Sequence, residues 1–171
     1  MILPKERDPR FITLRRGGTL TDFAHQLLAL WAATCAEHVL HLFEQANADD
    51  QRPRQAIELT RAWVNGEIPM KQAHQAAFAS NAAAKGMPAA ARFAALAAGQ
   101  AVAVAHVAAH ELGAAAYAIR AVRESVGENE RDTMGRNECQ WQRDQLPDAI
   151  RELVLDDQTV RNHLCWFAFT Y

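Results

Sequence analysis

The fold of this chain is determined chiefly by residues 89–121, whose sequence is AAARFAALAAGQAVAVAHVAAHELGAAAYAIRA. Alanine accounts for 35 of the 171 residues, and it is the strongest helix former and a poor strand former. Between residues 76 and 119 only three of 44 side chains are Lys, Arg, Asp or Glu. A helix without a polar face is usually buried on all sides. We therefore predict an all-α bundle with an alanine-rich helical hairpin at its centre; alternatively, one alanine face contacts a second subunit or another partner.

Helical periodicity and helix-end signals continue through most of the chain. They predict a first helix from residues 19–22 to 46, and further helices at 53–66, 69–85, 88–110, 113–127, 138–145 and 148–163. Residues 128–137 are polar and are predicted to form a loop, and Gly113 is predicted to mark a break or a close helix contact. Residues 1–18 are predicted to be an irregular arm with a local charge of +3. No long linker follows, so residues 19–171 are predicted to form one helical domain.

Charge and cysteine usage exclude several classes of protein. The chain has 18 basic and 20 acidic residues, which gives no general electrostatic basis for binding nucleic acid. Charged residues interrupt the longest near-apolar stretch, so no membrane span is predicted. The charged N-terminus lacks the apolar core of a signal peptide. The three cysteines are widely spaced and form no CxxC pair, which favours reduced thiols in a cytoplasmic protein; they are Cys35, Cys139 and Cys165.

Two histidine clusters are the candidates for chemistry. His106 and His110 are four residues apart beside Glu111, a spacing that can hold a ligand or a metal on one helix face. The order is not HExxH, and no third metal ligand is identifiable, so we favour a buried, hydrogen-bonded histidine pair at a helix contact and predict no metal or cofactor. His38 lies one helical turn after Cys35, and a thiol–imidazole contact is geometrically feasible. We expect Cys35 to be a small buried side chain instead.

No sequence pattern predicts an enzyme. The chain has no glycine-rich phosphate loop, no GxSxG motif and no motif with paired catalytic carboxylates. Arg52 and Arg54 stand at a predicted helix start, where the helix dipole disfavours cations. We expect internal ion pairs for them, with Glu58 or the acidic C-terminal region, and consider an anion or partner site as the alternative.

Charges are concentrated in the C-terminal third, which contains most of the candidate partner-binding side chains. The acidic candidates are Glu128, Glu130, Asp132, Glu138 and Asp144, followed by Asp148, Glu152, Asp156 and Asp157. They would face a basic partner, or they form a solvated helix face. Residues 141–162 are predicted to have a structural role, with Trp141 at one of their apolar positions; if its indole is not fully buried, it is a surface anchor for a partner. The apolar terminus LCWFAFTY, residues 164–171, is predicted to dock on the core or, alternatively, to meet another chain.

Five segments together resemble one family, the all-helical immunity-five-like domain of bacterial polymorphic toxin systems. They are RRGGTLTD (15–22), LLALWAATCAEHVLHLFE (27–44), RPRQAIELTRAWVNGE (52–67), GQAVAVAHVAAHELGAAAYAIRA (99–121) and WQRDQLPDAIRELVLDDQTVRN (141–162). The resemblance implies an immunity protein that binds and neutralises a cognate protein toxin without catalysis, and it brings no catalytic residues with it. A helical small-ligand or metal-binding protein and a homodimeric structural module remain the alternatives.

Overall fold

The computed structural model describes residues 3–171 and places seven α-helices in them. They are α1 Asp22–Glu44, α2 Arg52–Val64, α3 Met70–Ala83, α4 Ala89–Ala103, α5 Glu111–Glu124, α6 Arg131–Asp144 and α7 Asp148–Arg161. Short 3-10 turns lie at Pro9–Phe11, Leu14–Arg16, Ala108–His110, Glu128–Glu130 and Asn162–Cys165. Residues 3–171 contain no β-strand, only an isolated bridge between Thr13 and Leu20. The predicted all-α fold is confirmed.

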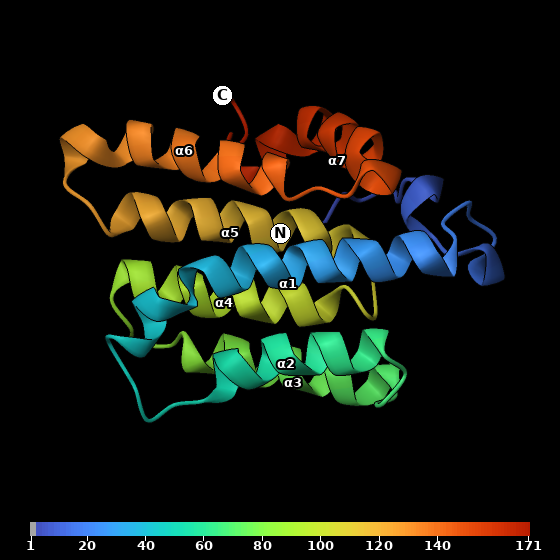
Figure 1. Cartoon of the computed structure of the whole chain (residues 1–171), viewed down its shortest axis with the longest axis horizontal. Coiled ribbons are helices and arrows are strands. Elements are labelled where there is room, and N and C mark those ends of the chain that lie inside the picture. The colour runs from blue at the N-terminus through green and yellow to red at the C-terminus, as the bar shows by residue number, and fades with distance from the viewer. Residues whose placement is uncertain (1–2) are drawn as a thin grey trace.

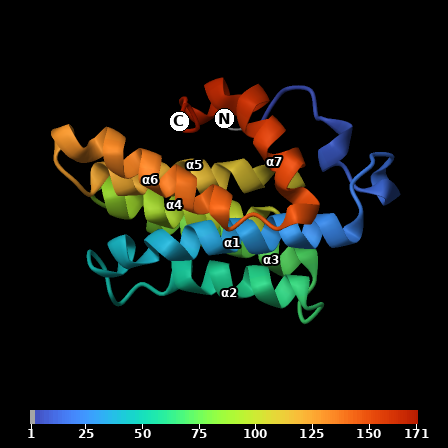
Figure 2. The same cartoon turned by 45° about the horizontal axis from the view of Figure 1, so that its top comes forward.

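The helices are stacked in layers (Figure 1). The α2–α3 hairpin forms one outer layer, α6 and α7 form the other, and α1, α4 and α5 lie between them. The turned view in Figure 2 shows the same order, with α1 running along the middle of the bundle. The arm that precedes α1 lies at the end of the bundle where the α2–α3 and α4–α5 connections also lie (Figure 1). No helix in residues 3–171 combines the length and apolarity that crossing a membrane requires.

The α4–α5 hairpin is central, as predicted, because its alanines let neighbouring helices approach closely. Helix α4 packs against α1, α2, α3 and α5, and α5 packs against α1 and α6. Almost every alanine of the two helices is buried by these neighbours. The alanine faces that could have met a second subunit are therefore covered within one chain.

Gly99 in α4 marks a close helix contact. A Cβ atom there would collide with the Asn81 side chain and lie 3.3 Å from the Ala77 carbonyl oxygen of α3. We expect Gly99→Leu to lower the free energy of unfolding by about 1–3 kcal/mol through overpacking, measured by urea denaturation. Gly127→Leu is the matched control, because the nearest atom to a Cβ at that exposed glycine would be Glu130 Oε2 at 4.0 Å. Equal stability of the two variants would contradict close packing at Gly99.

Three predicted helix boundaries are wrong. The break in the hairpin comes at residues 104–107 and not at Gly113, which lies inside α5. The alternative prediction for Gly113, a close helix contact, is confirmed, because its missing side chain leaves room for Gln100 of α4. Residues 128–137 are not a loop, because α6 already begins at Arg131. Their polar composition reflects a helix exposed on one side, and Gly135 faces inward beside Arg123. The last predicted helix also ends earlier, at Arg161, where a 3-10 turn follows.

Candidate functional site

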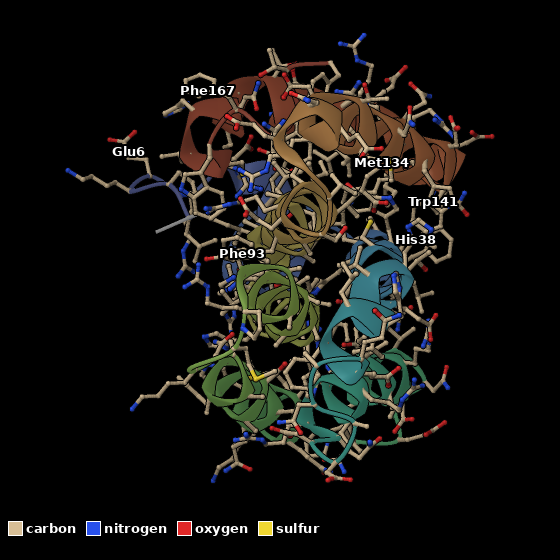
Figure 3. All side chains as sticks on the ribbon, turned by 90° about the vertical axis from the view of Figure 1, so that its left-hand side faces the viewer. Glu6, His38, Phe93, Met134, Trp141 and Phe167 are labelled. Atoms are coloured by element: carbon tan, nitrogen blue, oxygen red, sulfur yellow. The ribbon has the colours of Figure 1, made fainter. Side chains whose placement is uncertain are left out.

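A groove of about 410 Å³ lies between α1 and α6 and includes residues near the end of α5. The Trp141 ring of α6 stacks on the His38 ring of α1, with centroids 3.6 Å apart and planes 12° from parallel. Met134, one of the residues lining the groove, lies on α6 two turns before Trp141 (Figure 3). Trp141 is partly exposed, so its indole is not fully buried. The groove therefore exposes part of the Trp141 indole to solvent, and the stack on His38 fixes the position of that indole.

A buried hydrogen-bond network beneath the groove fixes this stack. His38 Nδ1 lies 2.8 Å from Glu138 Oε2, and Glu138 is only 4% exposed. Gln142 Nε2 donates to Glu138 Oε1 at 2.9 Å and to the Ala115 carbonyl at 3.2 Å. Glu138 thus orients His38 from inside, and its predicted place on a partner-facing acidic surface is wrong. Its carboxylate belongs to the interior of the α1–α5–α6 contact.

The other acidic candidates divide between the two ends of α6. Glu128, Glu130 and Asp132 are exposed at the turn from α5 to α6, near the groove. Asp132 also forms a 2.9 Å ion pair with Arg123. Asp144, at the far end of the helix, accepts a 2.8 Å hydrogen bond from Gln140. The predicted acidic surface is therefore reduced, near the groove, to Glu128, Glu130 and Asp132 at the start of α6.

The later acidic residues do not extend this surface uniformly. Asp148 and Glu152 are exposed on α7, and Asp156 pairs with Arg10 of the arm at 2.7 Å. Asp157 is 2% exposed and is paired with Arg161 inside the protein. The acidic side chains of α7 are therefore not all exposed, although they lie close together in the sequence.

Arg52 and Arg54 form internal ion pairs, but not with the predicted partners. Arg52 pairs with Asp50 at 2.5 Å, and Arg54 pairs with Glu44 at 2.5 Å. The Arg54 pair links the start of α2 to the end of α1, whereas the Arg52 pair is local to the turn before α2. Neither Glu58 nor the acidic C-terminal region takes part. The arginines fasten the α1–α2 turn because that turn brings the nearest carboxylates beside them.

His106 and His110 do not share a helix face, because both lie in the connection between α4 and α5. The His106 ring stacks on His74 of α3, with centroids 4.4 Å apart, and His110 Nδ1 is hydrogen-bonded to Gln100 Oε1 at 2.8 Å. The predicted hydrogen-bonded histidine pair is thus replaced by two separate contacts. Glu111 is fully buried and pairs with Arg161 at 3.0 Å. Within residues 3–171, no three His, Cys, Asp or Glu side chains are grouped to hold a metal ion.

His110 should make the fold sensitive to acid. Burial, and then the charges of His106 and Arg161, lower the pKa of His110 to about 4 from its usual 6.5. Between these values the unfolded chain binds a proton that the folded protein does not, so stability falls as the pH falls through this window. We expect His110→Asn to remove at most about 3 kcal/mol of that loss, at about 1.4 kcal/mol per pKa unit. Urea denaturation at pH 7 and pH 4.5 measures it, and the same change at exposed His41 should leave the acid loss intact.

The three cysteines are buried, so they offer no reactive thiolate. Burial raises the pKa of Cys35 well above its usual value and that of Cys165 to about 12. Burial also raises the pKa of Cys139. Cys35 is the small buried side chain that the sequence predicts, and it forms no hydrogen bond with His38.

A second exposed aromatic group lies on another face of the bundle (Figure 3). The Arg120 guanidinium sits 4.1 Å from the ring centre of Phe93 and 4.3 Å from that of Trp166. The terminus docks on the core through buried Phe169, while Trp166 and Phe167 are 44% and 64% exposed. Both exposed residues have left-handed backbone angles, with φ of 55° and 59°. The sequence shows that the terminus is apolar, but it does not indicate that Phe169 is buried while Trp166 and Phe167 are exposed.

The part of the sequence that forms the groove matches the model of a known protein family. A family model described as Imm-5 like putative immunity protein matches residues 18–149, which is 132 of the 171 residues. The matched range covers α1 to α6 and ends at the start of α7. No curated protein and no solved structure gives a significant match.

Proposed function

The chain belongs to the Imm-5 like family of immunity proteins, and we propose that it binds a cognate protein toxin and covers the toxin's functional surface without catalysing a reaction. We place this action in the cytoplasm, where buried, unpaired cysteines remain reduced. The family match over residues 18–149 is the observation that carries the proposal. The groove between α1 and α6 lies entirely within that match.

We assign toxin binding to this groove and its acidic end. Hot spots of protein interfaces are enriched in tryptophan and are held in defined positions before binding. Trp141 meets both conditions, because its ring is partly exposed and is stacked on His38. Glu128, Glu130 and Asp132 add negative charge beside the groove, which favours a basic surface on the toxin.

The groove side chains that could act as a base or a nucleophile form structural hydrogen bonds, which supports a binding role. Glu138 orients His38, a pairing that general-base catalysis also uses. Ser125, the hydroxyl side chain beside the groove, donates its hydrogen bond to the Val122 carbonyl at 2.8 Å. Nucleophilic catalysis needs the hydroxyl within reach of its base, and no hydrogen bond joins Ser125 to His38 in the described residues.

The test uses the toxin candidate encoded beside the gene, expressed with and without this protein. We expect the unchanged protein to restore growth and the triple variant Glu128→Lys, Glu130→Lys, Asp132→Lys to protect poorly. In vitro the association rate constant for the toxin should fall by at least about tenfold at low salt and by less at high salt. A matched charge reversal at three exposed carboxylates near α2, Asp49, Glu58 and Glu67, should retain protection.

The outcomes also separate binding from the alternative mechanisms. Folded His106→Ala and His110→Ala variants should protect fully, since neither residue lines the groove. Loss of protection in those variants, together with stoichiometric metal in the purified protein, would instead support a metal-dependent mechanism. Loss of protection in His38→Gln with unchanged toxin affinity would support catalysis.

A further inference from the structure

A second cavity, of about 470 Å³, lies at the end of the bundle where the N-terminal arm meets the helix connections. Its lining combines three arginines with aromatic and apolar side chains from separate elements. The residues used below are Arg7, Arg15, Arg16, Trp63, Met70 and His106. The arm supplies the arginines, the end of α2 and the start of α3 supply Trp63 and Met70, and the α4–α5 connection supplies His106.

Two of the three arginines, Arg15 and Arg16, lie on a hydrogen-bonded loop of the arm. Leu14 N donates to the Leu20 carbonyl at 3.0 Å, and Leu20 N donates to the Ile12 carbonyl at 2.9 Å, which closes the arm into a loop. Gly17 takes a left-handed φ of 83° at the tip of this loop, directly after Arg16. Arg15 and Arg16 therefore project from a folded loop, and Arg7 precedes that loop in the arm.

The positive charge of the cavity is only partly balanced. Arg15 pairs with Asp22 at 2.8 Å, but within residues 3–171 neither Arg7 nor Arg16 has a carboxylate at ion-pair distance. Arg7, Arg16 and His106 line the same cavity. Burial, followed by the charges of His74, Arg16 and Arg7, lowers the pKa of His106. His106 Nδ1 is buried and has no hydrogen-bond partner in the described part of the chain. About two net positive charges thus face one cavity.

We propose that this cavity binds a small phosphate monoester that carries a planar ring, such as a nucleoside monophosphate. Guanidinium groups bind phosphate oxygens through paired hydrogen bonds, and two unbalanced arginines match the charge of a phosphate monoester. The partly buried Trp63 indole, held 4.9 Å from the His25 ring, offers a surface for the planar ring, with Met70 beside it. The volume lies within the usual range of small-ligand sites, about 300–1,000 Å³.

The test is calorimetric titration of the full chain with adenosine 5′-monophosphate, adenosine and inorganic phosphate, each as a separate probe. We expect the monophosphate to bind at least about tenfold more tightly than either fragment, since only it uses both the arginines and Trp63. Arg7→Ala and Arg16→Ala should each weaken it by about tenfold, as expected for loss of a charged hydrogen-bond donor. The matched control is Arg136→Ala, an exposed arginine on α6 that lies outside this cavity and should leave the affinity unchanged.

Trp63 gives a second measurement that does not depend on the arginines. Monophosphate addition should quench tryptophan fluorescence in the unchanged protein but not in Trp63→Phe. Absence of monophosphate binding, or binding that Arg7→Ala and Arg16→Ala leave intact, would overturn the site. Equal affinity for inorganic phosphate and the monophosphate would overturn the ligand class, because the indole would then contribute nothing. These outcomes are independent of toxin neutralisation, which involves the groove at α6.

Discussion

Replacing Arg161 with methionine should lower the free energy of unfolding by about 3–5 kcal/mol, because the change leaves two buried carboxylates without their cation. Arg161 is 3% exposed, and its Nη2 lies 3.0 Å from Glu111 Oε1. Its Nε donates to Asp157 Oδ1 at 2.7 Å and its Nη1 to the Ala109 carbonyl at 2.9 Å. One guanidinium therefore links α7 to the start of α5 and to the turn before it.

The pH dependence of this variant distinguishes lost charge pairing from lost packing. Burial already raises the pKa of Glu111 well above its usual value, while Arg161 lowers it. Without Arg161 the folded protein should hold the Glu111 proton to a higher pH than the unfolded chain does. The folded state then binds more protons, so the variant should regain stability as the pH falls from 7 to 5. A packing defect alone would produce no such recovery relative to the unchanged protein.

Two further variants control for the loss of an arginine. Arg10→Met removes exposed ion pairs with Asp8 and Asp156 and should cost no more than about 1 kcal/mol. The triple change Glu111→Gln, Asp157→Asn, Arg161→Met removes the charges together and should recover much of the loss. Urea denaturation at pH 7 measures all three. A single Arg161→Met variant as stable as Arg10→Met would show that the buried triad contributes little.

Local chemistry made the helical bundle predictable from the sequence. Residues 76–119 are rich in alanine and contain few charged side chains. Alanine favours a helix locally, and a helix with few charges is buried by its neighbours, so the central hairpin was predicted correctly. The exact break was less predictable, because Gly113 stays inside α5 through a fit with Gln100 that only the packed helices create. Helix propensity does not report such contacts.

The candidate site depends on pairs that are distant in sequence. His38 and Glu138 are separated by 100 residues, and their contact follows from how α6 packs on α1. A loop has no helical periodicity. The predicted loop at 128–137 therefore gave no basis for distinguishing the buried Glu138 from the exposed Glu130 and Asp132. Gly135, Cys139 and Gln142 recur at four and three residues and would have marked the buried face of α6. Composition alone could not identify that face.

Truncation of Trp31 on α1 should destabilise the protein more than truncation of Trp141 on α6. Trp31 is 2% exposed, and its Nε1 donates to the Gln142 carbonyl at 2.8 Å. Trp31→Ala should lower the free energy of unfolding by about 3–5 kcal/mol, through the cavity it leaves and the loss of that hydrogen bond. Thermal and urea denaturation measure the loss, which should be accompanied by loosening of α6 against α1.

Trp141→Ala should instead cost only about 1–2 kcal/mol, because the indole is partly exposed and the main contact it loses is the stack on His38. If the groove binds the toxin, this folded variant should nevertheless fail to protect, with the toxin affinity reduced at least about thirtyfold, as for a hot-spot tryptophan worth 2 kcal/mol or more. Trp166→Ala is the matched control: that indole is 44% exposed on another face, so its loss should preserve protection. Full protection by folded Trp141→Ala and failure of Trp166→Ala would move the toxin interface from the groove to the surface around Arg120.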